Sequence, residues 1–249
     1  MKIAKLILIF ILLQSLFALS GKELAILMDE RESPQDMKST MSMVLTNKNG
    51  KMRSSEIRSY SKDASKKQIL WFLAPADDKG IAYLKIEHKD KNDDMKLWLP
   101  NFKKIRRISS RKKTESFMGS DMSYEDMTSR NLDEYTYSIT GSENINDKDC
   151  YILESIPNGI KTEYSMHRSW ITKDTYLLLK EESFDKNGQL LKNKSIIYQK
   201  IETYNIMKEL RVKNVQRNHQ TVLKFDNIDV DSGIKDNIFH EKNLKRMPK

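Results

Sequence analysis

Short runs of alternating apolar and polar residues, joined by tight polar turns, most constrain the fold of this chain. Met41, Met43 and Leu45 share one face of such a run, and residues 47–50 (NKNG) follow as a turn whose glycine accepts a positive φ. Residues 185–188 (DKNG) form the same kind of turn later in the chain. Because a period of two places neighbouring side chains on opposite faces of a sheet, the pattern predicts antiparallel hairpins.

Runs of this kind recur from residue 39 to residue 230, with no regular alternation of strands and long helices. They predict a mainly β fold of about ten or eleven short strands in a curved antiparallel sheet or barrel. Residues 21–249 contain no internal repeat, low-complexity segment or linker, which predicts a single domain.

The first twenty residues have the composition of a secretory signal peptide. Lys2 and Lys5 precede eight consecutive apolar residues at positions 6–13, and small residues stand at positions 18 and 20. This pattern predicts that residues 1–20 direct export and are then removed. A retained membrane anchor is the alternative, although the apolar run is short for a membrane span.

Residues 21–32 (GKELAILMDERE) predict an amphipathic helix at the start of the exported chain. Leu24, Leu27 and Met28 recur at helical spacing, and Pro34 ends or restarts the helix. The apolar stripe of this helix needs a partner surface, which the sheet would provide.

The sequence offers little support for an enzyme, a metal site or a cofactor. None of the four histidines has a second ligand at a metal-binding spacing, and the chain has no nucleophile elbow or glycine-rich phosphate loop. Its only cysteine, Cys150, lies in a strand-like run and is predicted to be a buried structural thiol.

Binding of an apolar ligand is better supported, because methionines and aromatic residues stand at alternating strand positions. Flexible, polarizable side chains suit a pocket for irregular acyl chains, although an ordinary hydrophobic core would give the same composition. The candidate pocket residues are Met41, Met43, Leu45, Trp71, Leu84, Ile86, Leu97, Leu99, Tyr137, Met166 and Trp170.

The stretch from residue 97 to residue 126 contains a dense run of cations. Its basic residues are Lys103, Lys104, Arg106, Arg107, Arg111, Lys112 and Lys113. Such a run suits anionic lipid head groups or a protein partner, and a solvated hairpin remains an alternative. Export and the lack of interleaved aromatic residues argue against nucleic acid.

A bend is predicted directly after the cations. Gly119 permits an unusual φ, and nearby hydroxyls and carboxylates can cap the turn that follows. The residues assigned to this structural motif are Phe117, Gly119, Ser120, Asp121, Tyr124, Glu125 and Asp126.

The order of these motifs resembles the outer-membrane lipoprotein-sorting protein family, which is related to the periplasmic lipoprotein carrier LolA. The resemblance rests on W-L-P-x-x-x-K-I-R-R-I at residues 98–108 and S-F-M-G-S-D-M-S-Y-E-D at residues 116–126. Residues 72–75 (FLAP), 79–84 (KGIAYL) and 170–180 (WITKDTYLLLK) also match, as does the F-x-x-x-x-L ending at residues 239–244.

The resemblance implies an unclosed antiparallel β-barrel whose apolar concave face is covered by helices. It also implies a periplasmic carrier of lipids or lipoprotein acyl chains, associated with an RND-type inner-membrane transporter. The helix at residues 21–32 would then be a lid, and transient contact with a membrane surface is expected. A non-carrier envelope adaptor that docks through its basic segment is the main alternative, and a lipid hydrolase is the least supported.

Overall fold

The computed structural model describes residues 19–246. Almost the whole predicted signal peptide, residues 1–18, therefore lies outside the described residues. Within residues 19–246, none of the helices has the length and apolar character needed to cross a membrane.

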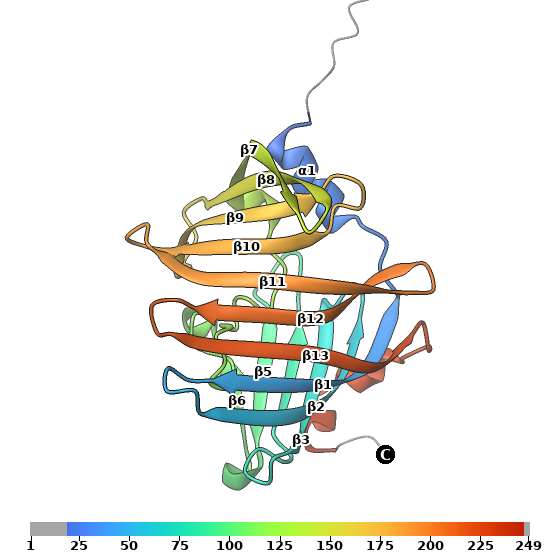
Figure 1. The fold of residues 1–249 in the computed structure, drawn as a ribbon. Coiled ribbons are helices and arrows are strands. Elements are labelled where there is room, and N and C mark those ends of the chain that lie inside the picture. The colour runs from blue at the N-terminus through green and yellow to red at the C-terminus, as the bar shows by residue number, and fades with distance from the viewer. Residues whose placement is uncertain (1–18, 247–249) are drawn as a thin grey trace, which may run out of the picture.

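Thirteen antiparallel strands form one strongly curved sheet (Figure 1). From edge to edge the order is β6-β5-β4-β3-β2-β1-β13-β12-β11-β10-β9-β8-β7, and the edge strands β6 and β7 are not paired with each other. The sheet is thus an unclosed barrel, which confirms the predicted fold class. The strands are β1 (Asp36–Thr46), β2 (Met52–Lys62), β3 (Lys67–Ala74), β4 (Ala82–Ile86), β5 (Asp94–Leu99), β6 (Lys104–Ile108), β7 (Tyr135–Ile145), β8 (Lys148–Pro157), β9 (Tyr164–Thr172), β10 (Leu178–Asp185), β11 (Leu190–Ile201), β12 (Tyr204–Asn214) and β13 (His219–Val230).

The sheet has more strands than the ten or eleven predicted, and β6 accounts for part of the difference. This strand lies inside the cationic run and contains only two apolar residues, Ile105 and Ile108. Its alternation is too short and too weakly apolar to be recognised from the sequence. It forms because β5 offers a ladder of partners, from Met95 opposite Ile108 to Leu99 opposite Lys104.

The two predicted hairpin turns are present. Gly50 has a φ of 77°, and its N–H donates to the carbonyl of Asn47 at 2.9 Å. Gly188 has a φ of 73° and donates in the same way to Asp185 at 2.9 Å. Glycine adopts this left-handed conformation without the steric cost of a side chain. These turns set the registers of β1 with β2 and of β10 with β11.

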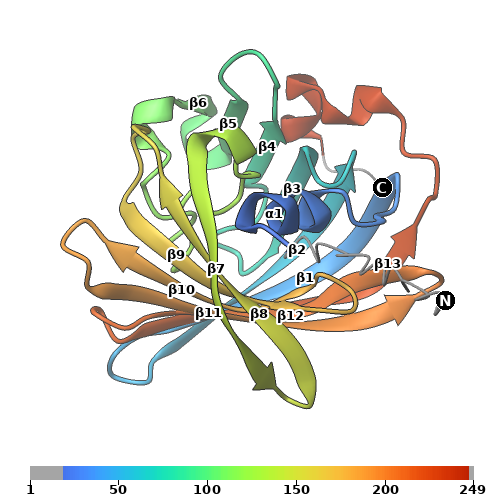
Figure 2. The same cartoon turned by 90° about the horizontal axis from the view of Figure 1, so that it is seen from above.

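Helix α1 (Gly21–Asp29) lies inside the curve of the sheet, over the concave face of β7–β9 (Figure 2). Ser20 and Glu23 form a reciprocal capping box that fixes its start. The helix approaches β7 closely because Gly21 has no side chain, and a Cβ atom there would lie 2.6 Å from the carbonyl carbon of Tyr137. It ends at Asp29, earlier than the predicted residue 32.

The main hydrophobic core lies on the concave face of β1–β5 and β11–β13. The segment between β6 and β7, residues 109–134, fills this part of the interior with Phe117, Met122 and Tyr124, all of which are buried. The two edge strands are therefore joined by a segment that runs through the inside of the barrel. We call residues 109–134 the inner segment.

A second apolar cluster covers the opposite, convex face of β3–β5. Here the short helices η4 (Asp236–Phe239) and η5 (Glu241–Lys245) place Phe239 and Leu244 against the sheet. The buried carboxylate of Asp36 holds the start of this tail, because it accepts hydrogen bonds from the N–H groups of residues 232, 233 and 234 at 2.9–3.0 Å. Of these helices, α1 covers the concave face, whereas η4 and η5 cover the outside.

Candidate functional site

Two cavities lie on the concave side, one on each side of the end of α1. The larger has a volume of about 530 Å³ and is bounded by α1, β7–β11 and the inner segment. The smaller has a volume of about 300 Å³ and is bounded by the end of α1 and by β1, β2 and β11–β13. Met28 and Asp29 line both cavities, so the last turn of α1 separates them.

The smaller cavity is the more apolar of the two in its side chains. The side chains that face it include three methionines and two aromatic rings. Its main apolar lining residues are Met28, Met37, Tyr198, Ile206, Met207 and Phe225. Tyr198, Met207 and Phe225 also pack against the main core, so the cavity continues the apolar interior. Methionine side chains adapt to irregular apolar ligands because they are flexible and polarizable.

The larger cavity is lined by buried charges that the sheet holds in ion pairs. The Glu181 carboxylate receives two hydrogen bonds from Arg130, at 2.7 and 2.8 Å, and one from Lys194 at 2.9 Å. Burial opposes ionisation of Glu181, but the two cations outweigh it and hold its pKa well below the ordinary value. Arg130 thereby ties the inner segment to β10 and β11.

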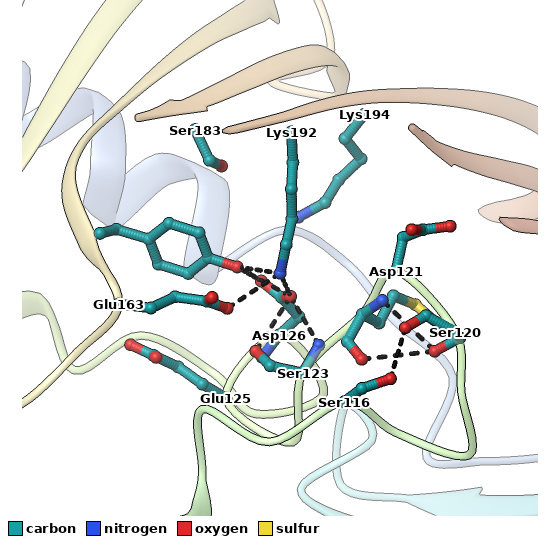
Figure 3. Close-up of polar contacts among 12 residues, drawn as sticks. Ser116, Ser120, Asp121, Ser123, Glu125, Asp126, Glu163, Ser183, Lys192 and Lys194 are labelled. Atoms are coloured by element: carbon teal, nitrogen blue, oxygen red, sulfur yellow. Dashed lines mark hydrogen bonds and ion pairs between the residues drawn. The ribbon is translucent and has the colours of Figure 1, made fainter. Parts of the chain in front are cut away.

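A second buried group joins the inner segment to β9 and β11 (Figure 3). Lys192 Nζ lies 2.9 Å from Asp126 Oδ2, 2.9 Å from Glu163 Oε1 and 2.6 Å from the Tyr164 hydroxyl oxygen. The Tyr164 hydroxyl also donates to Asp126. Burial raises the pKa of Tyr164, whereas at Asp126 the charges of Lys192 and Lys194 overcome burial and lower the pKa.

The predicted pocket residues divide among three places. Met41, Met43, Leu45, Leu97 and Leu99 lie on the concave face, but they pack against the inner segment in the main core and do not line either cavity. Of the predicted pocket residues, Tyr137 is the one that lines the larger cavity.

The remaining five predicted pocket residues lie outside the barrel, and their assignment to a concave pocket was wrong. Trp71, Leu84 and Ile86 pack under the C-terminal tail, where Trp71 Nε1 donates to the carbonyl of Asn243 at 3.0 Å. Trp170 donates to Glu143 on the outer face, and Lys180 lies 3.9 Å from its ring centroid. Met166 shares that outer face, opposite Phe184. Both faces of β3 and β4 are buried, so burial did not reveal which residues point inward.

The predicted lid residues lie on α1 and differ in how deeply they are buried. Leu24 is fully buried against the side chains of β8 and β9, Leu27 is half-buried, and Met28 faces both cavities.

The predicted docking cations are largely neutralised. Arg106 and Lys112 pair with Glu115, Arg107 pairs with Asp94 at 3.3 Å, and Lys113 pairs with Asp93 at 2.7 Å. Arg111 lies at the edge of the larger cavity. Lys103 and Lys104 are exposed and have no ion pair among residues 19–246, so they are the strongest part of the predicted surface.

The predicted bend binds the inner segment to the far side of the barrel. Asp121 accepts a hydrogen bond from the Thr221 hydroxyl at 2.7 Å and lies 2.8 Å from His219 Nδ1, so it contacts β13 instead of capping the next turn. The turn is capped by Asp126, whose carboxylate accepts the Ser123 N–H at 2.8 Å. Gly119 has a φ of 78°, Ser120 is buried, and Phe117 and Tyr124 pack in the core. Glu125 lines the larger cavity.

Sequence reasoning missed the polar lining of the larger cavity. Its main members, Arg130, His167, Glu181 and Lys194, come from three separate strands and from the inner segment. The available signal was that polar residues occupy both alternating sets of positions on β9–β11, which an apolar concave face does not allow. Cys150, in contrast, is buried as predicted.

Comparison with known proteins gives a consistent family. A family model described as "Uncharacterized protein" matches residues 64–246. A DUF1329 family protein from Desulfovibrio piger is 34% identical, with 90% of this chain and 97% of that chain covered and a TM-score of 0.84. An outer membrane lipoprotein-sorting protein domain from Vibrio parahaemolyticus is 31% identical, with 91% and 98% covered and a TM-score of 0.85. No curated protein matches.

The fold is shared more widely. A LolA superfamily protein from Nitrosomonas europaea has a TM-score of 0.71 at 18% identity, with 90% of this chain and 99% of that chain covered. This likeness places the unclosed barrel, with a helix on its concave face, in the LolA-like class of folds. Within that class, the chain belongs to the outer-membrane lipoprotein-sorting protein family.

Proposed function

We propose that the protein is a periplasmic carrier that binds the acyl chains of lipids or lipoproteins and shuttles them between envelope membranes. The observation that carries the proposal is the methionine-rich cavity of about 300 Å³ beside α1, on the concave side of the sheet. Membership of the lipoprotein-sorting family supports the same function. An adaptor without cargo would need only a filled barrel, and the two cavities favour a carrier over it.

Binding on this face would be driven by burial of the chain. Each methylene group removed from water contributes about 0.8 kcal/mol, so an acyl chain needs no polar contact for tight binding. The last turn of α1 suits the role of lid because Leu27 and Met28 are only partly buried there, whereas Leu24 anchors the helix against β8 and β9. Movement of its last turn would join the two cavities that Met28 now separates.

The proposal requires no catalytic step. The Glu181 and Asp126 side chains, which are almost inaccessible to solvent, are engaged by cations and hydroxyls, an arrangement that fixes the position of the inner segment. Burial raises the pKa of the Cys150 thiol, which leaves it a poor nucleophile.

A charge placed in the smaller cavity should abolish acyl binding. We expect Met207→Asp to weaken the binding of a fluorescent fatty acid at least tenfold, because a carboxylate there would be desolvated beside the chain. Met52→Asp is the matched control, since Met52 is 65% exposed and lies outside the cavities. The measurement is a fluorescence titration of both variants, together with mass spectrometry of lipids that copurify with the unmodified protein. Equal affinity of the two variants would remove the smaller cavity from the proposal.

We further propose that cargo is exchanged at an RND-type inner-membrane transporter through the turn that precedes β6. Phe102 is 70% exposed there, next to Lys103 and Lys104. An exposed aromatic ring beside unpaired cations suits either a protein interface or brief contact with an anionic membrane surface.

Reversal of these two charges should weaken docking. We expect Lys103→Glu with Lys104→Glu to reduce crosslinking to the transporter in cells at least about fivefold, while acyl binding by the purified protein is unchanged. The matched control is Lys48→Glu with Lys51→Glu, which reverses two exposed lysines at a different turn. If both pairs reduce crosslinking equally, net charge and not this surface is responsible. Vesicle flotation with anionic lipid would show whether the same turn contacts membranes.

A further inference from the structure

The larger cavity contains an unusual concentration of polar atoms without partners. Among residues 19–246, six buried side-chain atoms have no hydrogen-bond partner in the protein, and three of them belong to residues that line this cavity. They are Glu125 Oε2, the Tyr137 hydroxyl oxygen and His167 Nε2. Burying a polar atom without a partner is unfavourable, so three such atoms around one cavity indicate a place where a ligand supplies the missing hydrogen bonds.

Of the three atoms, His167 Nε2 is the strongest evidence for a ligand in this cavity. Its side chain is 1% exposed, and its Nδ1 lies 2.8 Å from the Ser183 hydroxyl, which fixes the ring. Its other ring nitrogen, Nε2, is buried and has no hydrogen-bond partner among residues 19–246. Because the imidazole is held neutral, Nε2 either donates or accepts, according to the tautomer.

The charges around the cavity argue against an ionic ligand. Five acidic and five basic residues line it, so the lining has no excess of either sign: Asp29, Glu125, Asp126, Glu134 and Glu181 oppose Arg111, Lys113, Arg130, Lys161 and Lys194. Arg130 and Lys194 are already bound to Glu181. No lysine or arginine within residues 19–246 forms an ion pair with Glu125, so an anionic group would meet this carboxylate directly.

Hydroxyl groups match all three atoms, because a hydroxyl donates to a carboxylate and both donates to and accepts from a phenol or an imidazole. Aromatic side chains add flat apolar surface at the same place, since Tyr135, Tyr137 and Tyr164 line the cavity with His167. A concave site that combines aromatic surface with polar groups is a usual setting for a small ligand.

We propose that the larger cavity binds a neutral, hydroxyl-rich head group of the carried lipid, such as a glycerol or a sugar. This inference rests on the proposed carrier function and gives it a preference among lipids. Glu125, Tyr137 and His167 are the residues that recognise the head group, while the apolar interior beyond α1 holds the chain.

The test compares two amphiphiles that share one acyl chain. Monomyristoylglycerol has a neutral diol head group, and myristate has a carboxylate. Each is used to displace a fluorescent acyl probe from the purified protein at neutral pH, and free glycerol is titrated separately. We expect monomyristoylglycerol to bind about tenfold more tightly than myristate, because each added hydrogen bond is worth about fivefold in affinity.

Two conservative variants test which side chains cause the preference for monomyristoylglycerol. Glu125→Gln and Tyr137→Phe should each weaken binding of monomyristoylglycerol about fivefold and change binding of myristate less than twofold. Tyr60→Phe is the matched control, since Tyr60 packs with Trp71 on the outer face. Circular dichroism and thermal unfolding establish that each variant is folded before binding is measured.

The outcomes separate this inference from the proposed function. Equal binding of the two amphiphiles, or a preference that both variants retain, overturns the head-group site and leaves the acyl carrier intact. Free glycerol that binds as tightly as its ester indicates a site for a free polyol and also overturns it. Failure of both amphiphiles to bind overturns the carrier function itself.

Discussion

Phe117→Ala should lower the free energy of unfolding by about 3–5 kcal/mol, the usual cost of removing a fully buried aromatic side chain. Phe117 is 1% exposed and joins the inner segment to the sheet. Its ring centroid lies 5.2 Å from that of Tyr83, 5.8 Å from that of Tyr124 and 6.3 Å from that of Phe72. Removal of the ring leaves a cavity that these neighbours are too rigidly held to fill.

Urea unfolding followed by circular dichroism measures this loss, and Phe102→Ala is the matched control. Because Phe102 is 70% exposed, its replacement should change the free energy of unfolding by less than about 0.5 kcal/mol. A loss below about 1 kcal/mol for Phe117→Ala, accompanied by tighter acyl binding, would contradict a fixed core. It would show instead that the inner segment leaves the barrel to make room for cargo.

Acidification should destabilise the protein well before its paired carboxylates titrate. Burial, reinforced by Arg130, lowers the pKa of His167 from 6.5 to about 3, and Lys194 acts in the same direction while Glu181 and Asp126 oppose it. The unfolded chain therefore binds a proton at this histidine over a pH range in which the folded chain does not. The resulting stability is fully present above pH 6.5 and is lost as the pH falls toward 3.

Between pH 6.5 and pH 4.5 this histidine should remove roughly 2–3 kcal/mol of stability. Asp126 and Glu181 have lowered pKa values, so their contributions are lost only below the ordinary carboxylate range. Denaturant unfolding at several pH values should therefore show a slope in this window that His167→Gln removes. His240→Gln, which replaces an exposed histidine, should leave the slope unchanged. The same slope in both variants would assign the pH dependence to other groups.

Much of the fold could be predicted because local chemistry determines it. The turn residues Asn47 and Asp185 each accept hydrogen bonds from backbone N–H groups two and four positions later, at 2.9–3.0 Å. Such turns specify hairpins without reference to the rest of the chain. The start of α1 also depends on local chemistry, since the side chains of Ser20 and Glu23 cap it.

The side of the sheet to which each side chain points could not be predicted, because a single irregular residue in a strand reverses the alternation after it. The alternation of β9 predicts that Tyr164 and Met166 point the same way, but the register with β10 shifts between Phe184 and Asp185. Tyr164 therefore points into the barrel, where its ring lies 4.5 Å from that of His167, while Met166 points outward. A bulge of this kind has no distinctive sequence.

The buried charged residues of the site could not be predicted either, and the reason is related. Arg130 and Glu181 are 51 residues apart, and Asp126 and Lys192 are 66 apart. Only the curvature of the complete sheet brings these pairs together. Glu181 and Glu182 are neighbours in β10, so their side chains face opposite sides of the sheet. The sequence did not show that one of those sides encloses charges.

The open barrel also leaves two strand edges whose backbone groups invite pairing with another chain. At one edge, β6 is only five residues long, and the exposed Lys103 and Lys104, which have no ion pair among residues 19–246, bring like charge to any second copy that approaches. At the other edge, the register of β7 with β8 is interrupted between Ile139 and Gly141. The cations that first suggested a binding surface therefore have a second consequence. Their like charges oppose edge-to-edge pairing of the incomplete barrel with its own copies.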